Sequence, residues 1–489
     1  MNKFDPNACR DYNRTITRRR FMGTSAGALA ASAATASMMP DWFAKTARAA
    51  CSIPSSNSRP VFIFIHLAGG PDGLAMIAPY GDLSYSDVRP STGPLTLKAY
   101  DVNDELTARP LHGIGSSFFG LSPALGPFSS GTAASSNVTN YGLLDLWNND
   151  RLIIAPATAI PSQSYSHFTA EDQLATGCTT SCSSVVDGFM ANYLNAISGS
   201  NLLRGISLNA SVLGPLVNGD ATLPVPDPAN FGIGGHYATR DDRLAEFVTM
   251  WDNLGGTLWP SVAESTACAI DYIDGAMASD STTADFGAER LDLTMKDLAN
   301  IIRQDIGLEM ACLSFGGWDT HSKQGNTQPG GRMWNLMIEL SRAVTSFIED
   351  MDNAGKDVCV VFCGEFGRTA RAQSNISDAG TDHGNAGPLF IAATENVING
   401  GASGATSTHG IPGIIGDWGT SGHDDLLQTG KLHDTNAACG AGDRDLCSLT
   451  DRRDLIFEVL DTVVNPGTTL NRGDIFQGYS TGQTYGIAN

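Results

Sequence analysis

The chain has 489 residues, 42% of them hydrophobic, and its 51 acidic and 30 basic side chains give a net charge of −21. This apolar content is ordinary for a globular protein of one large domain or two. The excess of negative charge disfavours binding to nucleic acid and to anionic lipid, because both are polyanions.

Residues 1–49 have the pattern of a twin-arginine signal peptide. Residues 17–22 (TRRRFM) contain the arginine pair, a mildly apolar stretch follows over residues 21–39, and residues 47–49 (ARA) offer a small-x-small cleavage site. The apolar stretch is too weak to remain in a bilayer, and we expect no stable membrane span elsewhere. We therefore expect the twin-arginine translocase to export the protein to the periplasm or outside the cell; an ordinary basic arm is the alternative.

Export would change the charge of the chain and the chemistry of its cysteines. The signal holds eight basic and three acidic residues, so the mature chain has a net charge of −26. Cys51 follows two alanines, as in a lipoprotein signal, but Arg48 stands where such signals have an aliphatic residue. Cysteines near each other in polar loops are candidates for disulfides, whereas cysteines in an apolar run are expected in the core. The candidates are Cys178 with Cys182 and Cys439 with Cys447, and the core pair is Cys359 and Cys363.

Five continuous apolar runs predict strands that are buried on both faces of a parallel sheet. These runs are residues 61–67, 152–156, 308–314, 358–363 and 388–393, and helical patterns cover residues 240–254, 287–304, 333–353 and 451–464. Strands that alternate with helices predict an α/β fold of three layers, with a doubly wound and mostly parallel sheet. Residues 200–285 open with turns rich in Gly, Pro and Asn, and we expect them to form an insertion or cap in a single domain that spans residues 50–489.

Polar clusters follow the apolar runs, and in an open parallel sheet ligands bind at the carboxyl ends of the strands. Asp72, among glycines after the first run, is either a metal ligand or a turn residue that caps a helix. Ser166 follows the second run. At the start of a helix it could act as a nucleophile in the positive field of the helix N-terminus, or simply cap the helix.

Three further clusters contain acidic and imidazole groups. Asp319 and His321, two positions apart after the third run, suit one metal ion or a hydrogen-bonded pair in a turn. Glu365 and Arg368 follow the fourth run, as a metal ligand and an anion clamp or as a surface ion pair. Asp382 and His383 precede the last run. Together with Asp72 and Ser166, these groups would suffice for two metal ions that stabilise an in-line displacement at phosphorus or sulfur.

These motifs resemble those of a twin-arginine-exported bacterial family catalogued as domain of unknown function 1501. Five motifs occur in order over nearly the whole mature chain: GGPDGL with APYGD in residues 69–82, SHF at 166–168, GGWDTH at 316–321, GEFGR at 364–368 and TDHG at 381–384. That family is similar to the alkaline phosphatase and sulfatase superfamily. The resemblance implies an alkaline phosphatase-like fold and a divalent metal cofactor, either zinc, calcium or magnesium.

The superfamily pattern can be laid on this chain residue by residue. Asp72 then stands for the metal ligand after the first strand, and Ser166 for the nucleophile, with Ser164 as the other candidate. Asp319 and His321 stand for a metal-binding pair.

The superfamily's Asp-His pair at a strand end has two counterparts here. By motif it is Asp382 with His383, and by position it is Glu365 with Phe366. We prefer the second match, in which His383 is a later metal-binding histidine and Phe366 fills one ligand position. A second metal would then be held weakly or not at all.

The sequence therefore predicts an exported, metal-dependent hydrolase of phosphate or sulfate esters on an anionic small molecule or polymer. Ser166, His167 and Arg368 are the catalytic candidates, and the metal ligands are Asp72, Asp319, His321, Glu365, Asp382 and His383. The alternative is a non-catalytic secreted binding or assembly protein that keeps the fold, with or without one metal. A metal-free serine hydrolase is a weaker third hypothesis, because the apolar runs carry no Gly-x-Ser-x-Gly elbow.

Overall fold

A computed structural model describes residues 58–487, except 83–84, 100, 102, 105, 112–117, 127–141, 180–186, 198, 200, 233–239, 253–257, 279, 374–377, 399–412, 417–445, 447, 449 and 466–468. The described residues contain an eight-stranded sheet in the order β13-β5-β12-β9-β1-β8-β6-β7. Its strands are β1 (Val61–His66), β5 (Leu152–Ala159), β6 (Gly205–Ser207), β7 (Thr222–Pro224), β8 (Met310–Ser314), β9 (Val358–Cys363), β12 (Gly387–Ala393) and β13 (Thr450–Asp451). The sheet and its flanking helices confirm the α/β class.

The sheet is mostly parallel, as expected, with one exception. Strands β1, β8 and β9 pair in parallel at the centre, and β6, β7, β5 and β13 point the same way. Strand β12 is antiparallel to both of its neighbours, β5 and β9. The amino end of β12 therefore lies at the same edge as the carboxyl ends of the other strands, and the chain that leads into β12 can contribute to a site there.

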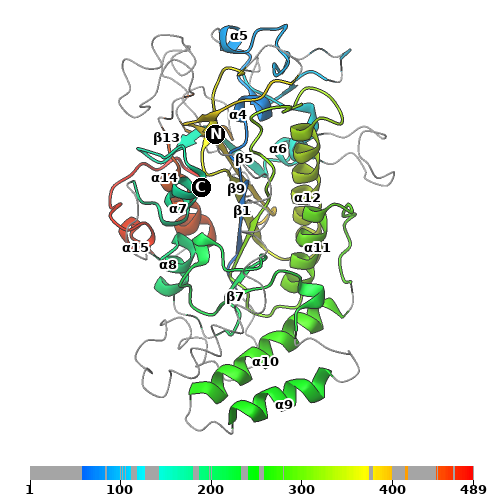
Figure 1. Cartoon of the computed structure of the whole chain (residues 1–489), viewed down its shortest axis with the longest axis vertical. Helices are drawn as coiled ribbons and strands as arrows, with labels where there is room; N and C mark the ends of the chain where they lie inside the picture. Colours follow the sequence, from blue (N-terminus) through cyan, green and yellow to red (C-terminus); the bar gives the residue numbers. More distant parts are fainter. Residues whose placement is uncertain are drawn as a thin grey trace, which may run out of the picture.

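Helices cover both faces of the sheet (Figure 1). On one side lie α6 (Leu143–Asn148), α11 (Arg290–Arg303) and α12 (Arg332–Ala354), and on the other lie α7 (His167–Thr176), α8 (Phe189–Ala196), α14 (Arg452–Glu458) and α15 (Arg472–Ile475). Side chains of β1 alternate between the two layers, since Ile63 and Ile65 pack in one hydrophobic cluster and Phe62 and Phe64 in the other. This double burial explains why β1 is a continuous apolar run.

Phe64 offers a test of this packing. Its ring is fully buried and lies edge-on to Phe189 of α8, with ring centroids 5.4 Å apart. We expect Phe64→Leu to lower the free energy of unfolding by about 1 kcal/mol. Phe168→Leu is the matched control, because Phe168 is 82% exposed, and it should change stability by less than about 0.5 kcal/mol. Chemical denaturation of both variants measures the difference, and equal effects would contradict the layer arrangement.

The stretch at residues 200–285, expected to be an insertion or cap, is only partly separate from the sheet. Strands β6 and β7 are the last two strands at one edge of the main sheet, so residues 205–224 belong to the core fold. The helices α9 (Arg240–Asp252) and α10 (Leu258–Met277) lie at the lower end of the molecule, whereas α4 (Gly73–Met76), just after β1, lies near the upper end (Figure 1). The helix pair is therefore distant from the carboxyl edge of the sheet.

Shorter elements complete the described fold. They are β2 (Ile77–Ala78), α5 (Tyr85–Val88), β3 (Arg109–Pro110), β4 (Gly120–Leu121), η1 (Pro123–Leu125), η2 (Gly214–Leu216), η3 (Pro228–Asn230), β10 (Gly367–Arg368), β11 (His383–Gly384) and the π-helix η5 (Val459–Val464), which continues α14. Strands β10 and β11 form a two-stranded ribbon in which Arg368 pairs with His383. This ribbon connects the end of β9 to the start of β12 at the carboxyl edge.

Several predictions from the sequence fall outside the described residues. The signal at residues 1–49, Cys51, Cys182, Cys439 and Cys447 are among them. Cys178 and Cys268 each take part in a disulfide. Cys359 and Cys363 are buried free thiols, as predicted. Among the described helices, none combines the length and the apolarity needed to cross a membrane.

Candidate metal centre

Five segments bring polar side chains to the carboxyl edge of the sheet. The chain beyond β1, β5, β8 and β9 supplies four of them, and the ribbon before β12 supplies the fifth. Close approach of these segments depends on Gly69, whose φ of +115° is in a region that favours glycine. A Cβ at Gly69 would collide with the backbone of Asp319, so any other residue would force the segments after β1 and β8 apart.

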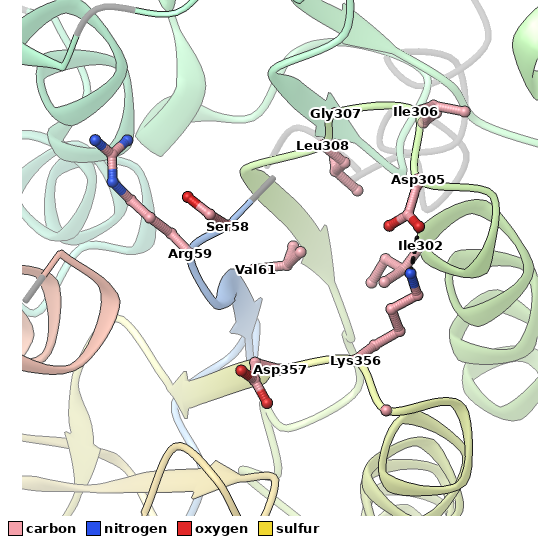
Figure 2. Close-up of a pocket in the computed structure, with 11 residues that line it drawn as sticks. Ser58, Arg59, Val61, Ile302, Asp305, Ile306, Gly307, Leu308, Lys356 and Asp357 are labelled. Carbon is pink, nitrogen blue, oxygen red and sulfur yellow. Dashed lines mark hydrogen bonds and ion pairs between the residues drawn. The ribbon is translucent and has the colours of Figure 1, made fainter. Parts of the chain in front are cut away.

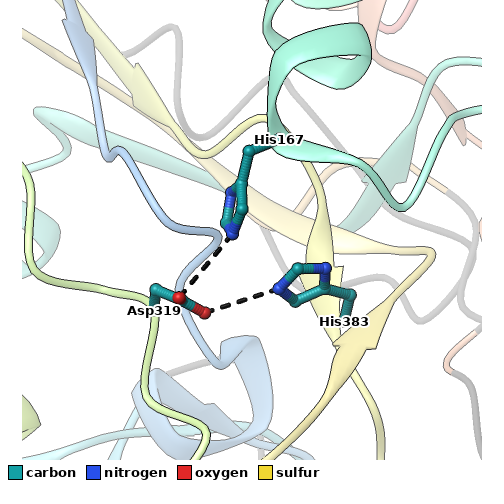
Figure 3. Close-up of side chains that lie close together, drawn as sticks. All are labelled: His167, Asp319 and His383. Carbon is teal, nitrogen blue, oxygen red and sulfur yellow. Dashed lines mark ion pairs between the residues drawn. The ribbon is translucent and has the colours of Figure 1, made fainter. Parts of the chain in front are cut away.

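Three imidazole rings converge on the carboxylate of Asp319. Nε2 of His321 lies 3.0 Å from Oδ1 of Asp319, and Nε2 of His383 lies 3.4 Å from the same oxygen. Nε2 of His167 lies 3.7 Å from Oδ2, and Figure 3 shows His167 and His383 both directed at the carboxylate. The two Nε2 atoms of His321 and His383 are 3.0 Å apart. We call these four residues the histidine–aspartate cluster.

The other ring nitrogen of each histidine faces an oxygen acceptor. Nδ1 of His167 lies 2.6 Å from Oε1 of Glu365, and Nδ1 of His383 lies 2.6 Å from the carbonyl oxygen of Tyr165. Because a carboxylate and a carbonyl can only accept, these Nδ1 atoms carry the hydrogen, so the Nε2 lone pair of each ring faces the cluster whenever the ring is neutral. Nδ1 of His321 is 3.5 Å from Oδ1 of Asp382. Such outer partners are typical of metal-binding histidines.

Glu365 is a buried carboxylate that contacts several groups around the cluster. Besides His167, its carboxylate accepts hydrogen bonds from Nε2 of His66 at 3.0 Å and from the backbone N–H groups of Gly69 and Gly70. Burial alone would raise the pKa of Glu365, but the hydrogen bonds to His167 and His66 outweigh burial and hold it well below the ordinary value. Glu365 is therefore an anion that orients histidines, and its carboxylate is occupied by these donors.

The same contacts shift the protonation of the cluster itself. The hydrogen bond to Glu365 raises the pKa of His167. Burial lowers the pKa of His321, and the positive charge of Arg368 acts in the same direction. For Asp319, burial opposes ionisation, but the hydrogen bond and the charge of Arg368 prevail and lower its pKa. An ionised carboxylate beside a neutral imidazole is a suitable donor set for a cation.

The spacing of the donor atoms fits one metal ion. A tetrahedral site with metal–ligand bonds of about 2.0–2.1 Å has ligand atoms about 3.3 Å apart. Four of the six pairwise distances within the histidine–aspartate cluster run from 3.0 to 3.7 Å. Ligand atoms of His167, Asp319 and His383, and likewise of His321, Asp382 and His383, lie within 4.8 Å of one another. Phe366 packs beneath the rings, with its centroid 4.9 Å from His167 and 4.5 Å from His383.

Asp72, predicted as a metal ligand, lies apart from the cluster. It belongs to none of the ligand groups found among the described residues. Its carboxylate caps α4 by accepting from the N–H of Ala75, and its Oδ2 pairs with Nη2 of Arg89 at 2.8 Å. The alternative interpretation, a turn residue that caps a helix, therefore describes Asp72, because a buried arginine already neutralises it.

Arg368 does not have the environment expected of an anion clamp. Its side chain is completely buried, and its guanidinium donates to the carbonyl oxygens of Gly69, Gly70, Trp318 and Thr381. It also donates to Oδ1 of Asp319 at 2.6 Å. Arg368 thus links three segments of the site and fixes the carboxylate of Asp319. Its charge is directed into the protein, which is why it does not serve as an anion clamp.

Ser166 occupies the N-cap position of α7, but its hydroxyl makes no capping hydrogen bond. The residue is exposed and directly precedes His167. Its backbone N–H donates to the hydroxyl of Ser164, the other nucleophile candidate. Ser166 is therefore the chain neighbour of one member of the cluster, and its hydroxyl is not used to cap the helix.

His66 and Glu171 are the residues that the sequence motifs did not reveal. His66 is the last residue of β1, and its side chain, Glu171 and Glu365 form a third group of potential ligands. The signal for His66 was its position, since it is the one polar residue of an otherwise apolar run and stands at the carboxyl end of a central strand.

A cavity of about 300 Å³ lies at the opposite edge of the sheet (Figure 2). Its lining residues Val61, Leu308 and Asp357 stand at the amino ends of β1, β8 and β9. Lys356, which also lines it, is paired with Asp305 at 2.5 Å. The six residues of β1 span about 20 Å, so this cavity is remote from the histidine–aspartate cluster.

The fold and the cluster define an α/β protein with a histidine-rich centre at the carboxyl edge of a mostly parallel sheet. Residues 275–414 match the family described as protein of unknown function, DUF1501. The matched segment contains Asp319, His321, Glu365, Arg368 and His383, in agreement with the motifs in the sequence. No curated protein matches the chain.

Proposed function

We propose that this protein binds one divalent metal ion through His167, His383, Asp319 and His321. The observation that carries the proposal is the convergence of three Nε2 atoms on one carboxylate, while Nδ1 of each ring faces an oxygen. Without a cation, two imidazole nitrogens 3.0 Å apart would have to share a single proton.

The donor set favours a metal of the zinc type over calcium or magnesium. Imidazole nitrogen suits zinc and its transition-metal neighbours, whereas calcium and magnesium prefer a shell of oxygen ligands. Only one of the four proposed ligands, Asp319, offers oxygen. We therefore narrow the three metals expected from the sequence to zinc or a metal of similar preference.

We propose further that the centre serves an exported hydrolase of phosphate or sulfate esters. A zinc-type ion would polarise an ester oxygen or lower the pKa of a water molecule. Ser166 is the candidate nucleophile, because it adjoins His167 and its hydroxyl makes no capping bond. His167, whose pKa is raised by Glu365, can hold a proton at Nε2 when no metal is bound. The solvent-exposed faces of Asp319 and His321 give an anionic substrate access to the cluster.

A second candidate is a non-catalytic binding or assembly protein with the same metal centre. Two observations favour it. Arg368 is surrounded by backbone carbonyls, so it does not bind a substrate anion. Asp72 forms an ion pair with Arg89, so it does not bind a second metal. The cluster then holds one ion and lacks the second metal that the superfamily's chemistry uses.

Metal analysis and turnover separate the two candidates. Purified mature protein should contain about one equivalent of zinc and hydrolyse an aryl phosphate or an aryl sulfate. Ser166→Ala should then lower kcat by about 10³-fold or more without changing the metal content, as expected for loss of a nucleophile. Ser164→Ala is the matched control and should keep its activity. Bound zinc with no turnover would favour the binding protein, and absence of metal would refute both.

A further inference from the structure

We infer that Gln324 is a positioning residue of the proposed metal centre, and that Asp72 acts through it. The inference rests on the proposed centre and assigns a role to residues that touch neither metal nor substrate. Gln324 is fully buried, three positions after His321, in the segment that follows β8.

All hydrogen-bonding groups of the Gln324 amide are used. Its Oε1 accepts from the hydroxyl of Thr320 at 3.1 Å and from the hydroxyl of Thr381 at 2.9 Å. Its Nε2 donates to Oδ2 of Asp72 at 2.6 Å and to Oδ1 of Asn326 at 3.4 Å. An amide oxygen has two acceptor sites and an amide nitrogen has two hydrogens, so this side chain is saturated.

The two threonines are adjacent to the proposed ligands. Thr320 lies between Asp319 and His321, and Thr381 lies two positions before His383. The backbone N–H of Thr381 also donates to the carbonyl of Thr320 at 3.1 Å. Both threonines are completely buried. Gln324 therefore connects the segment after β8 to the ribbon before β12, at the points where each presents its ligands.

Asp72 determines which way the amide faces. A carboxylate can only accept, so Nε2 must point toward Asp72 and Oε1 toward the threonines. Asp72 is in turn fixed by Nη2 of Arg89 and by its bond to the start of α4. Asp72, which the sequence predicts as a metal ligand, thus supports the proposed ligands indirectly. It accepts a hydrogen bond from Gln324, which in turn accepts from the threonines beside the ligands.

The primary test is the affinity of the full mature protein for Co²⁺, followed by its visible absorption and by calorimetry. Gln324→Met keeps the size of the side chain and removes both polar groups. It should weaken Co²⁺ binding several-fold, less than the about 10- to 100-fold expected for a direct partner of a ligand, because Gln324 bonds the threonines beside the ligands. It should also alter the absorption of the bound ion. Asn192→Leu is the matched control, because it removes a buried amide that donates to the carbonyl of Ile475 in α15, and it should leave Co²⁺ binding unchanged.

A milder pair of variants keeps the test decisive if Gln324→Met does not fold. Thr381→Val removes the hydroxyl that Gln324 accepts from, and should weaken Co²⁺ binding several-fold. Thr381→Ser retains the hydroxyl and should bind Co²⁺ as the wild type does. Equal affinity of Thr381→Val and Thr381→Ser, in a protein that binds Co²⁺, would overturn the role of Gln324 and leave the centre standing. Failure of the wild type to bind Co²⁺ or Zn²⁺ would instead refute the centre itself.

Discussion

Replacing Asp319 by asparagine should abolish tight metal binding, with a loss of affinity for Zn²⁺ of more than about 100-fold. Outer partners of a metal site already contribute about 10- to 100-fold, and Asp319 is the one anionic ligand at the middle of the cluster. The change keeps the shape of the side chain. In the wild type, the buried guanidinium of Arg368 lies 2.6 Å from Oδ1 of Asp319. The change removes this anionic partner.

Asp220→Asn is the matched control for Asp319→Asn. Asp220 also pairs with a buried arginine, since its Oδ2 lies 3.1 Å from Nη1 of Arg204, but it belongs to none of the segments that form the cluster. We expect its affinity for Zn²⁺ to remain within a few-fold of the wild type. Calorimetric titration gives both affinities, and the rise in melting temperature with added Zn²⁺ gives an independent measure, since a ligand at 100 times its Kd stabilises by about 2.7 kcal/mol. Unchanged binding by Asp319→Asn would show that the cluster is only a hydrogen-bonded network.

The second large effect is expected at Glu365. Glu365→Gln should lower the free energy of unfolding by about 3 kcal/mol, because the variant removes a buried anion and turns an N–H group toward donors that need an acceptor. His66 and His167 would both lose their partner. Glu395→Gln is the control, since the Glu395 side chain is 68% exposed, and its effect should stay below about 0.5 kcal/mol. Denaturant unfolding of both variants in the metal-free state measures the difference.

The lowered pKa of Glu365 also predicts how the free energy of unfolding depends on pH. Its pKa in the folded protein is well below the ordinary value of 4.5, so in acid the unfolded chain binds a proton that the folded chain does not. Its contribution is therefore complete above about pH 4.5 and declines as the pH falls further. The wild type should lose stability steeply below that pH, and Glu365→Gln should show a shallower slope over the same range. Parallel curves for the two proteins would contradict this assignment.

Much of the scaffold could be predicted from apolar patterning. The run at residues 358–363 coincides with β9, and the helical pattern at residues 333–353 lies within α12. These elements are predictable because a strand buried on both faces and a long amphipathic helix have strong periodic signals. The direction of β12 is different. A continuous apolar run is the same whether a strand is parallel or antiparallel, so only the structure reveals that β12 is reversed.

The sequence predicts which residues form the cluster better than it predicts the role of each residue. Asp319 and His321 lie in a motif after β8, and His383 lies in a motif before β12. The structure brings these three residues together with His167. Asp72 has a similar motif, but its role depends on Arg89, which is 17 positions away and carries no motif of its own. Sequence position shows that a polar group can reach the edge of the sheet, whereas its role depends on which counter-charge is buried beside it.

Because neighbouring strands of the sheet come from distant parts of the sequence, the cluster unites residues that are remote along the chain, with 218 positions between Tyr165 and its partner His383. A partly synthesised or unfolded chain therefore holds no fragment of the centre that could retain an ion tightly. If the protein binds an ion at the proposed centre, capture would have to follow the assembly of β5, β8, β9 and β12, and it would add directly to the stability of that assembly. The compartment in which the sheet forms, rather than the one in which the protein finally resides, would then decide which metal it carries.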